Sequence, residues 1–112
     1  MRKINLENYT VVIPTTEGEK EIPYVVRKSI EGVLLATGEP TQQRLSMADL
    51  LRNARIAQKI TSSKDGSVLL EENEFQIVKA SFDNFRGFGI NDVELCNRIE
   101  NAEVVEVQEK EL

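Results

Sequence analysis

The sequence predicts an α+β fold: an N-terminal β-hairpin and short strands packed against three to four helices. Turn residues separate two short segments of strand composition at the start of the chain, and apolar residues then recur at helical spacing in later segments. The length of 112 residues matches one domain, and no repeat, low-complexity tract or linker divides it. We therefore expect a single domain over residues 1–112, ending in a short charged tail at about 108–112.

The predicted hairpin lies near the N-terminus. Residues 9–13 are mostly β-branched and stop at Pro14, which favours a strand. Residues 15–19 have the composition of a turn, and a short strand at residues 20–23 would close the hairpin. Residues 25–36 carry apolar side chains at helical spacing, so we predict a helix there, although their β-branched content is also compatible with a strand.

The clearest helix is predicted at residues 46–60. Ser46 is a good N-cap, and Asp49 places an acidic group in the first turn, close to the pattern of a capping box. An apolar face along this helix indicates the side that packs on the core. Its members are Leu50, Leu51, Ala54, Ala57 and Ile60.

Another helix is predicted at residues 72–85, where phenylalanine and valine recur on one side and acidic residues gather near the start. A following helix would begin with Asn91 as its N-cap and run to about residue 101. Glu94 is spaced to complete a capping box, and Ile90 and Leu95 are spaced to form a hydrophobic staple around the cap.

Two further short strands are predicted, at residues 68–70 and 104–107, on their β-branched and apolar content. A loop at residues 61–66 separates the first of them from the helix before it. The expected core comprises Phe75, Phe82, Leu50, Leu51 and Ile99.

The chain contains no histidine and a single cysteine, Cys96. It therefore lacks the usual general base near neutral pH, the Ser-His and Cys-His pairs, and the commonest zinc ligand. We expect the thiol to be buried and structural. Asp83 and Glu94 have the spacing of the two ends of a calcium-binding loop, but the residues between them cannot act as its ligands. The prediction is no enzyme, no metal and no cofactor.

The best candidate for a binding surface is a basic stripe on the helix at 46–60. Arg52, Arg55 and Lys59 share one side of that helix, with Arg44 close by in the sequence. We favour a structural interpretation, in which these side chains are either solvated or paired with the acidic second half of the same chain. The functional alternatives are contact with an acidic protein partner or with a nucleic-acid backbone.

The formal net charge of −5 is unevenly distributed. Residues 1–64 hold ten Lys and Arg against seven Asp and Glu, a balance of +3, and residues 65–112 hold four against twelve, a balance of −8. An acidic chain disfavours non-specific binding to nucleic acid or to anionic lipid. The N-terminus has no apolar run that would make a signal peptide or a membrane span, so we expect a cytoplasmic protein without a membrane partner.

The sequence Arg-Gly-Phe-Gly at residues 86–89 matches the opening of an RNA-binding motif in which aromatic residues of a strand stack on bases. The positions after it lack the aromatic residues that the motif requires, and the stretch before it has helical spacing. We favour the structural alternative, a corner between two helices in which Gly87 and Gly89 supply unusual backbone angles.

Residues 69–80 (LLEENEFQIVKA) and 85–95 (FRGFGINDVEL) resemble the C-terminal half of small uncharacterised proteins encoded in bacteriophage genomes. The likeness covers well under half of the chain, carries no catalytic signature and transfers no functional residue. It implies a viral accessory or virion-associated protein, located in the host cytoplasm or in the virion.

The function predicted from the sequence is a non-enzymatic protein–protein interaction module, a phage-type accessory or assembly protein. Its partner would be a viral or host protein, and self-association into a homo-oligomer is a further expectation. The alternative is a nucleic-acid-binding regulator that uses the basic helix at 46–60. An enzyme built on carboxylates is a third hypothesis, for which the sequence offers no convergent group of residues.

Overall fold

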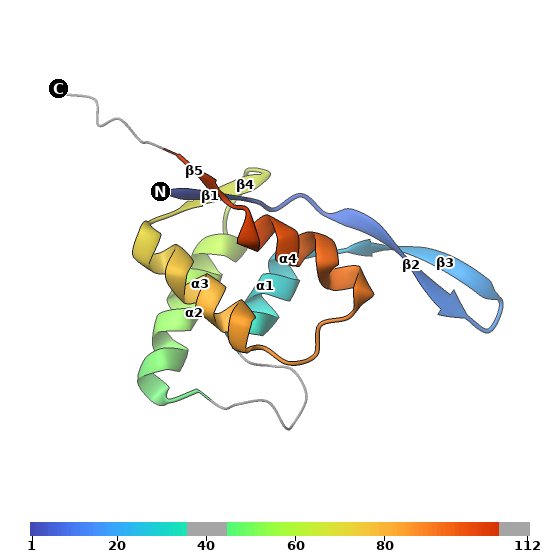
Figure 1. The fold of residues 1–112 in the computed structure, drawn as a ribbon, viewed down its shortest axis with the longest axis horizontal. Coiled ribbons are helices and arrows are strands. Elements are labelled where there is room, and N and C mark those ends of the chain that lie inside the picture. The colour runs from blue at the N-terminus through green and yellow to red at the C-terminus, as the bar shows by residue number, and fades with distance from the viewer. Residues whose placement is uncertain (36–44, 106–112) are drawn as a thin grey trace.

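The computed structural model describes residues 1–35 and 45–105 and confirms the α+β fold (Figure 1). The hairpin and the predicted helices are present, with ends close to the expected ones. The elements in chain order are β1 (Arg2–Asn5), β2 (Tyr9–Thr15), β3 (Gly18–Tyr24), α1 (Val26–Leu34), α2 (Met47–Thr61), β4 (Ser67–Leu70), α3 (Glu72–Asn84), the 3₁₀ helix η1 (Ile90–Asp92), α4 (Val93–Glu100) and β5 (Glu103–Val104).

β1 is the central strand of a three-stranded antiparallel sheet with the strand order β4-β1-β5. Sequence periodicity does not predict this strand, because four residues with one apolar side chain, Ile4, are too short to show an alternation. Ile4 is nevertheless fully buried. The last strand, β5, is shorter than expected within the described residues, and residues 106 and 107 of that prediction lie outside them.

The helices cover one face of this sheet, and the hydrophobic core lies between the two layers (Figure 1). Phe75, Phe82 and Ile99 are buried in this core, as predicted, with 1%, 7% and 2% of their surface exposed. The other almost fully buried apolar side chains come from both layers and include Ile4, Leu6, Ile30, Leu34, Ile60, Leu70, Val78 and Leu95.

The prediction that Leu50 and Leu51 lie in the core is wrong, because they are 41% and 53% exposed. The predicted members Ala57 and Ile60 are buried, but they share the buried face of α2 with Asn53 and Ile56. Asn53 is the polar member of this face, and its side-chain amide donates a 2.9 Å hydrogen bond to the backbone oxygen of Leu34 at the end of α1. A buried polar group is tolerated when it is hydrogen-bonded, but a search for apolar periodicity leaves it out.

Two predictions about helix starts have different outcomes. Ser46 is confirmed as the N-cap of α2, since its Oγ accepts a 3.2 Å hydrogen bond from the backbone N–H of Asp49. The hydrophobic staple of Ile90 and Leu95 is wrong, because Ile90 is 84% exposed while Leu95 is fully buried.

The predicted capping box of Asn91 and Glu94 is also wrong. A 3₁₀ turn precedes α4, so the α-helix begins only at Val93. The carboxylate that accepts the first backbone hydrogen bond belongs to Asp92, whose Oδ2 lies 2.7 Å from the amide nitrogen of Gly89. The 3₁₀ turn thus shifts the capping pattern by two residues toward the N-terminus relative to the sequence-based expectation.

Candidate functional site

The hairpin stands apart from the rest of the fold. β2 and β3 (residues 9–24, called the arm) form a separate two-stranded sheet, and Figure 1 shows the arm extending away from the helices and the three-stranded sheet, which together are called the body. The register is regular from Tyr9 opposite Tyr24 to Thr15 opposite Gly18. Gly18 has a φ of 114° next to the two-residue turn, a conformation that favours glycine.

The two faces of the arm differ in exposure. Residues directly opposite each other in an antiparallel pair share a face. One face carries the stacked tyrosines at the base and the Val11–Ile22 pair, of which Val11 is only 8% exposed. The other face, called the outer face, consists of exposed residues throughout: Thr10, Val12, Pro14, Glu19, Glu21 and Pro23.

Proline interrupts both long edges of the arm. Pro14 lies opposite Glu19, and Pro23 lies opposite Thr10. Proline has no N–H, so in an antiparallel pair it occupies the position whose N–H would point away from the partner strand. Each outer edge therefore lacks a hydrogen-bond donor near the end of its strand. This disfavours the addition of a further strand at either edge.

Two tyrosines clamp the base of the arm to the body. The rings of Tyr9 and Tyr24 stack with their centroids 4.5 Å apart and their planes 12° from parallel. The Tyr9 hydroxyl donates a 2.8 Å hydrogen bond to the backbone oxygen of Asn91, and the Tyr24 hydroxyl donates one to the carboxylate of Asp92. Burial raises the pKa of both phenols, and the bond to Asp92 raises that of Tyr24 further. Both hydroxyls therefore remain donors at neutral pH.

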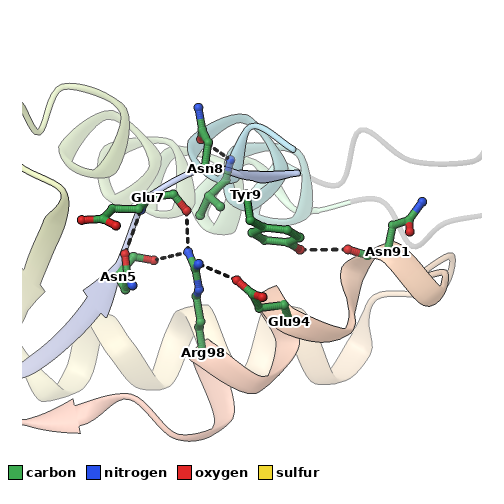
Figure 2. A network of polar contacts seen from close by, with 8 residues as sticks. Asn5, Glu7, Asn8, Tyr9, Asn91, Glu94 and Arg98 are labelled. Carbon is green, nitrogen blue, oxygen red and sulfur yellow. Dashed lines mark hydrogen bonds and ion pairs between the residues drawn. The ribbon is translucent and has the colours of Figure 1, made fainter. Parts of the chain in front are cut away.

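Arg98 of α4 contacts the segment that leads into the arm (Figure 2). Its guanidinium lies 5.2 Å from the centre of the Tyr9 ring. Nη1 donates hydrogen bonds of 3.2 and 2.6 Å to the backbone oxygens of Asn5 and Glu7, and Nη2 pairs with Glu94 at 2.5 Å. The side chain is only 17% exposed. The planar fork of donors lets one residue tie the β1–β2 connection to α4.

Asn8 links the base of the arm to α1. Its Oδ1 accepts a 3.0 Å hydrogen bond from the backbone N–H of Val26, in the first turn of that helix (Figure 2). The residue at the N-cap position, Val25, has no side chain that could accept such a bond. Asn8 therefore caps α1 from a distant part of the chain, and the arm is fixed against α1 as well as α4.

Lys59, one of the predicted binding residues, is engaged within the chain. Its Nζ lies 2.8 Å from Oε1 of Glu74 in α3. Partial burial acts to raise the pKa of Glu74, but the hydrogen bonds from Lys59 and from the backbone N–H of Glu71 outweigh it, and the pKa lies below its ordinary value. This contact matches the interpretation in which the stripe pairs with the acidic half of the chain.

The two arginines of the stripe are freer. Arg52 forms an ion pair with Asp49 at 3.5 Å, in which both side chains are about half exposed at 50% and 49%. Such surface pairs contribute about 0–1 kcal/mol, so Arg52 still presents its charge to solvent. Arg55 is exposed and forms no ion pair or hydrogen bond with the residues that the structure describes. Arg44, the fourth candidate, lies outside the described residues.

An exposed apolar ridge runs beside these arginines. Met47, Leu51 and Arg55 are spaced at i, i+4 and i+8 and therefore lie on one side of α2. Met47 is 78% exposed and Leu51 is 53% exposed. Together with Arg52, these residues form a surface of mixed apolar and basic character, called the α2 surface.

The RNA-binding interpretation of residues 86–89 finds no support in the geometry. The segment is not a strand, and Phe88 packs against Phe82 and Phe85 with ring centroids 5.5 and 4.8 Å apart. Gly87 has a φ of 132°, as the corner alternative requires, whereas the φ of −115° at Gly89 is open to any residue. The aromatic side chain of this motif contributes to the body.

Cys96 lies half-buried beside the same aromatic residues. It lines a hollow of ≈ 380 Å³ between α3 and α4, together with Phe82, Phe85 and Phe88. Burial raises the pKa of the thiol, so little of the nucleophilic thiolate forms at neutral pH. These observations agree with a structural role for the cysteine.

The tyrosine clamp and Arg98 were not predicted. A turn centred between residues 16 and 17 places Tyr9 opposite Tyr24, so the register of the hairpin was a usable signal for the stack. Arg98 gives no such signal, because its acceptors include backbone oxygens that lie more than 90 residues away in the sequence.

Within residues 1–35 and 45–105, no group of three or more His, Cys, Asp and Glu side chains gathers closely enough to hold a metal ion. No helix in this part of the chain is long and apolar enough to cross a membrane. Comparison with protein-family models, with curated proteins and with solved structures found no match. The arm and the α2 surface are therefore the features from which a function can be inferred.

Proposed function

We propose that the chain is a non-enzymatic protein–protein interaction module, an accessory or assembly protein of the bacteriophage type, and that the arm is its contact element. The observation that carries this proposal is the arm itself. It is regularly paired and firmly clamped at its base, yet its outer face is exposed and covers no part of the body.

The clamp at the base supports a role in binding. Tyr9, Tyr24 and Arg98 hold the arm at a fixed direction relative to α4. A contact element that is ordered before binding loses less conformational entropy when the complex forms. A hairpin whose only role was to connect β1 to α1 would not need such a clamp.

The composition of the outer face also suits a protein partner. Val12 is 47% exposed and stands opposite Glu21, and Pro14 stands opposite Glu19. Apolar side chains bordered by charged ones are typical of interfaces between proteins that also exist apart.

The alternative, a nucleic-acid-binding regulator that uses α2, has less support. Lys59 is engaged by Glu74 in α3, so among the described residues of the stripe only Arg52 and Arg55 are left without a partner in another element. The arm carries three glutamates and one lysine, and this net negative charge would be repelled by phosphates.

The bacteriophage part of the proposal rests on the resemblance of residues 69–80 and 85–95 to phage-encoded proteins. The partner would then be a viral or host protein, met in the host cytoplasm or in the virion. A membrane partner and a cofactor are not part of the proposal.

Affinity capture tests the proposal. The tagged chain is incubated with bacterial lysate and with an untagged copy of itself, and bound proteins are identified by mass spectrometry. Val12→Lys, on the outer face, should abolish capture and leave the melting temperature unchanged. Leu69→Lys is the matched control, because Leu69 is 39% exposed on a strand of the body. Its capture should equal that of the wild type.

Two results would overturn the proposal. Capture that survives Val12→Lys would remove the arm as the contact element. A gel shift with DNA or RNA that weakens steeply with salt, in the absence of any captured protein, would favour the nucleic-acid alternative instead.

A further inference from the structure

We infer that the partner of the arm is a second copy of this chain, with the outer face of one arm lying along the α2 surface of the next molecule. This inference rests on the proposed function, because it names the partner of the same arm. The two surfaces match in charge, in apolar character and in length.

The charges of the two elements are opposite. The arm holds three glutamates and one lysine, a balance of −2, and α2 holds two arginines, one lysine and one aspartate, a balance of +2. Glu19 and Glu21 lie on the outer face, and Arg52 and Arg55 lie on the α2 surface. Opposite potentials steer two molecules together and favour one register of the contact over others.

Each surface also carries exposed apolar side chains beside its charges. Val12 on the arm is 47% exposed, and Met47 and Leu51 on α2 are 78% and 53% exposed. Large exposed apolar side chains that gather beside charged residues are a common mark of a contact site. A contact between the two surfaces would remove all three from water.

The two elements have the same length. β2 contains seven residues, which at about 3.3 Å per residue extend about 23 Å. α2 contains fifteen residues, which at about 1.5 Å per residue extend about 22 Å. The strand ribbon can therefore lie along the whole helix.

One molecule cannot make this contact with itself. Figure 1 shows the arm leaving the body beside α4, while α2 lies on the opposite side of the helical layer. Each molecule would give its arm to one neighbour and receive the arm of another. Such a head-to-tail contact produces a closed ring or an open chain of molecules.

The arrangement that competes most directly is pairing of two arms, edge to edge. Pro14 and Pro23 disfavour it, because each removes a donor from the edge that would have to pair. Contact through the outer face leaves these edges unused.

Charge reversal tests the inference, with the mass distribution of the full chain measured by analytical ultracentrifugation. The arm variant is E19K/E21K and the helix variant is R52E/R55E, and each should associate roughly tenfold or more weakly than the wild type. D83K/E103K and K28E/K64E are the matched controls, which make the same changes of net charge at exposed sites elsewhere. Both controls should associate like the wild type.

Restoration is the decisive measurement. An equimolar mixture of the arm variant and the helix variant should assemble again, because each acidic arm then meets a basic helix and each basic arm meets an acidic one. The chain that carries all four substitutions should also assemble. Circular dichroism of every variant checks that the fold is kept.

Three outcomes would overturn the inference. A helix variant that still associates by itself would show that α2 is not the receiving surface. A failure of the mixture to assemble would show that the two surfaces do not meet. A wild type that stays monomeric, while capture of a different protein still depends on Val12, would remove the second copy as partner and leave the proposed function standing.

Discussion

The arm and the body are stabilised by different interactions. In the body, Ile4, Leu70 and Phe75 are almost completely buried, whereas Val11 is the residue of the arm that is buried to a comparable degree. The arm depends on cross-strand pairs and on the polar contacts at its base. The difference indicates that the body is held by the hydrophobic effect and that the arm is held by local pairing, so equal substitutions should have unequal effects.

The largest difference is expected for a matched pair of isoleucines, both of them in strands. Ile4→Ala in β1 removes a fully buried side chain and should lower the free energy of unfolding by about 2–5 kcal/mol. Ile22→Ala in β3 removes a half-buried one and should cost about 1 kcal/mol or less. Urea denaturation measures both. Equal losses would mean that the arm is an integral part of the core.

The next effect concerns the joint between the two regions. Arg98→Ala removes charge-assisted hydrogen bonds to Asn5 and Glu7 and should lower the free energy of unfolding by about 2 kcal/mol. In this variant, amide hydrogen exchange over residues 9–24 should be faster than in the wild type, and the increase should exceed any increase in α3. Arg98→Lys should recover only part of the protection, because an ammonium lacks the planar fork of donors. Unchanged exchange in the arm would contradict the role of Arg98 in fixing the base of the arm.

A smaller effect is expected for the tyrosine that joins the arm to the body. Tyr24→Phe removes the bond to Asp92 and should cost about 1 kcal/mol at neutral pH. Because the native state raises the pKa of Tyr24, its contribution is fully present below the ordinary phenol pKa of about 10 and is lost as the pH rises beyond it. The melting temperature should be measured below and above that pH. Its decrease between the two should be smaller in Tyr24→Phe than in the wild type. Parallel pH curves would argue against this bond.

The smallest effect lies wholly within the body. Lys59→Met removes a surface ion pair with Glu74 and should change the free energy of unfolding by about 0–1 kcal/mol. The native state lowers the pKa of Glu74, so the pair contributes above the ordinary glutamate pKa of about 4.3 and is lost as the pH falls through the lower native value. On acidification, the wild type should therefore lose slightly more stability than Lys59→Met. The opposite order would show that the pair is not formed.

Periodicity and turn chemistry were sufficient for the local elements. The hairpin, the helices and the N-cap at Ser46 depend on neighbouring residues, so the sequence shows them directly. β1 and the inward face of α2 depend on partners far along the chain. Asn53 illustrates this, because the acceptor of its side-chain N–H is the backbone oxygen of Leu34, in another helix.

The features of the candidate site likewise fall into those that residue spacing shows and those that depend on tertiary packing. The basic stripe on α2 can be found from residue spacing, but the ion pair that occupies Lys59 depends on how α2 and α3 pack. The arm was predicted as a hairpin and not as a contact surface. A strand pattern cannot show that no layer of the body covers one of its faces, since this depends on the direction in which the clamp holds the hairpin.

The central position of β1 determines the order in which the chain can fold. Arg2 is paired with Leu70 and Val104, which follow it by 68 and 102 residues, whereas the paired residues of the arm are at most 15 residues apart in the sequence. Local hairpins close within about 1–10 μs, and contacts of long sequence separation form more slowly. During synthesis the cross-strand pairs of the arm can form as soon as residues 9–24 leave the ribosome, but the contacts at its base and the three-stranded sheet must wait for almost the whole chain. A chain that stops before residue 103 would keep its arm and leave one edge of β1 unpaired.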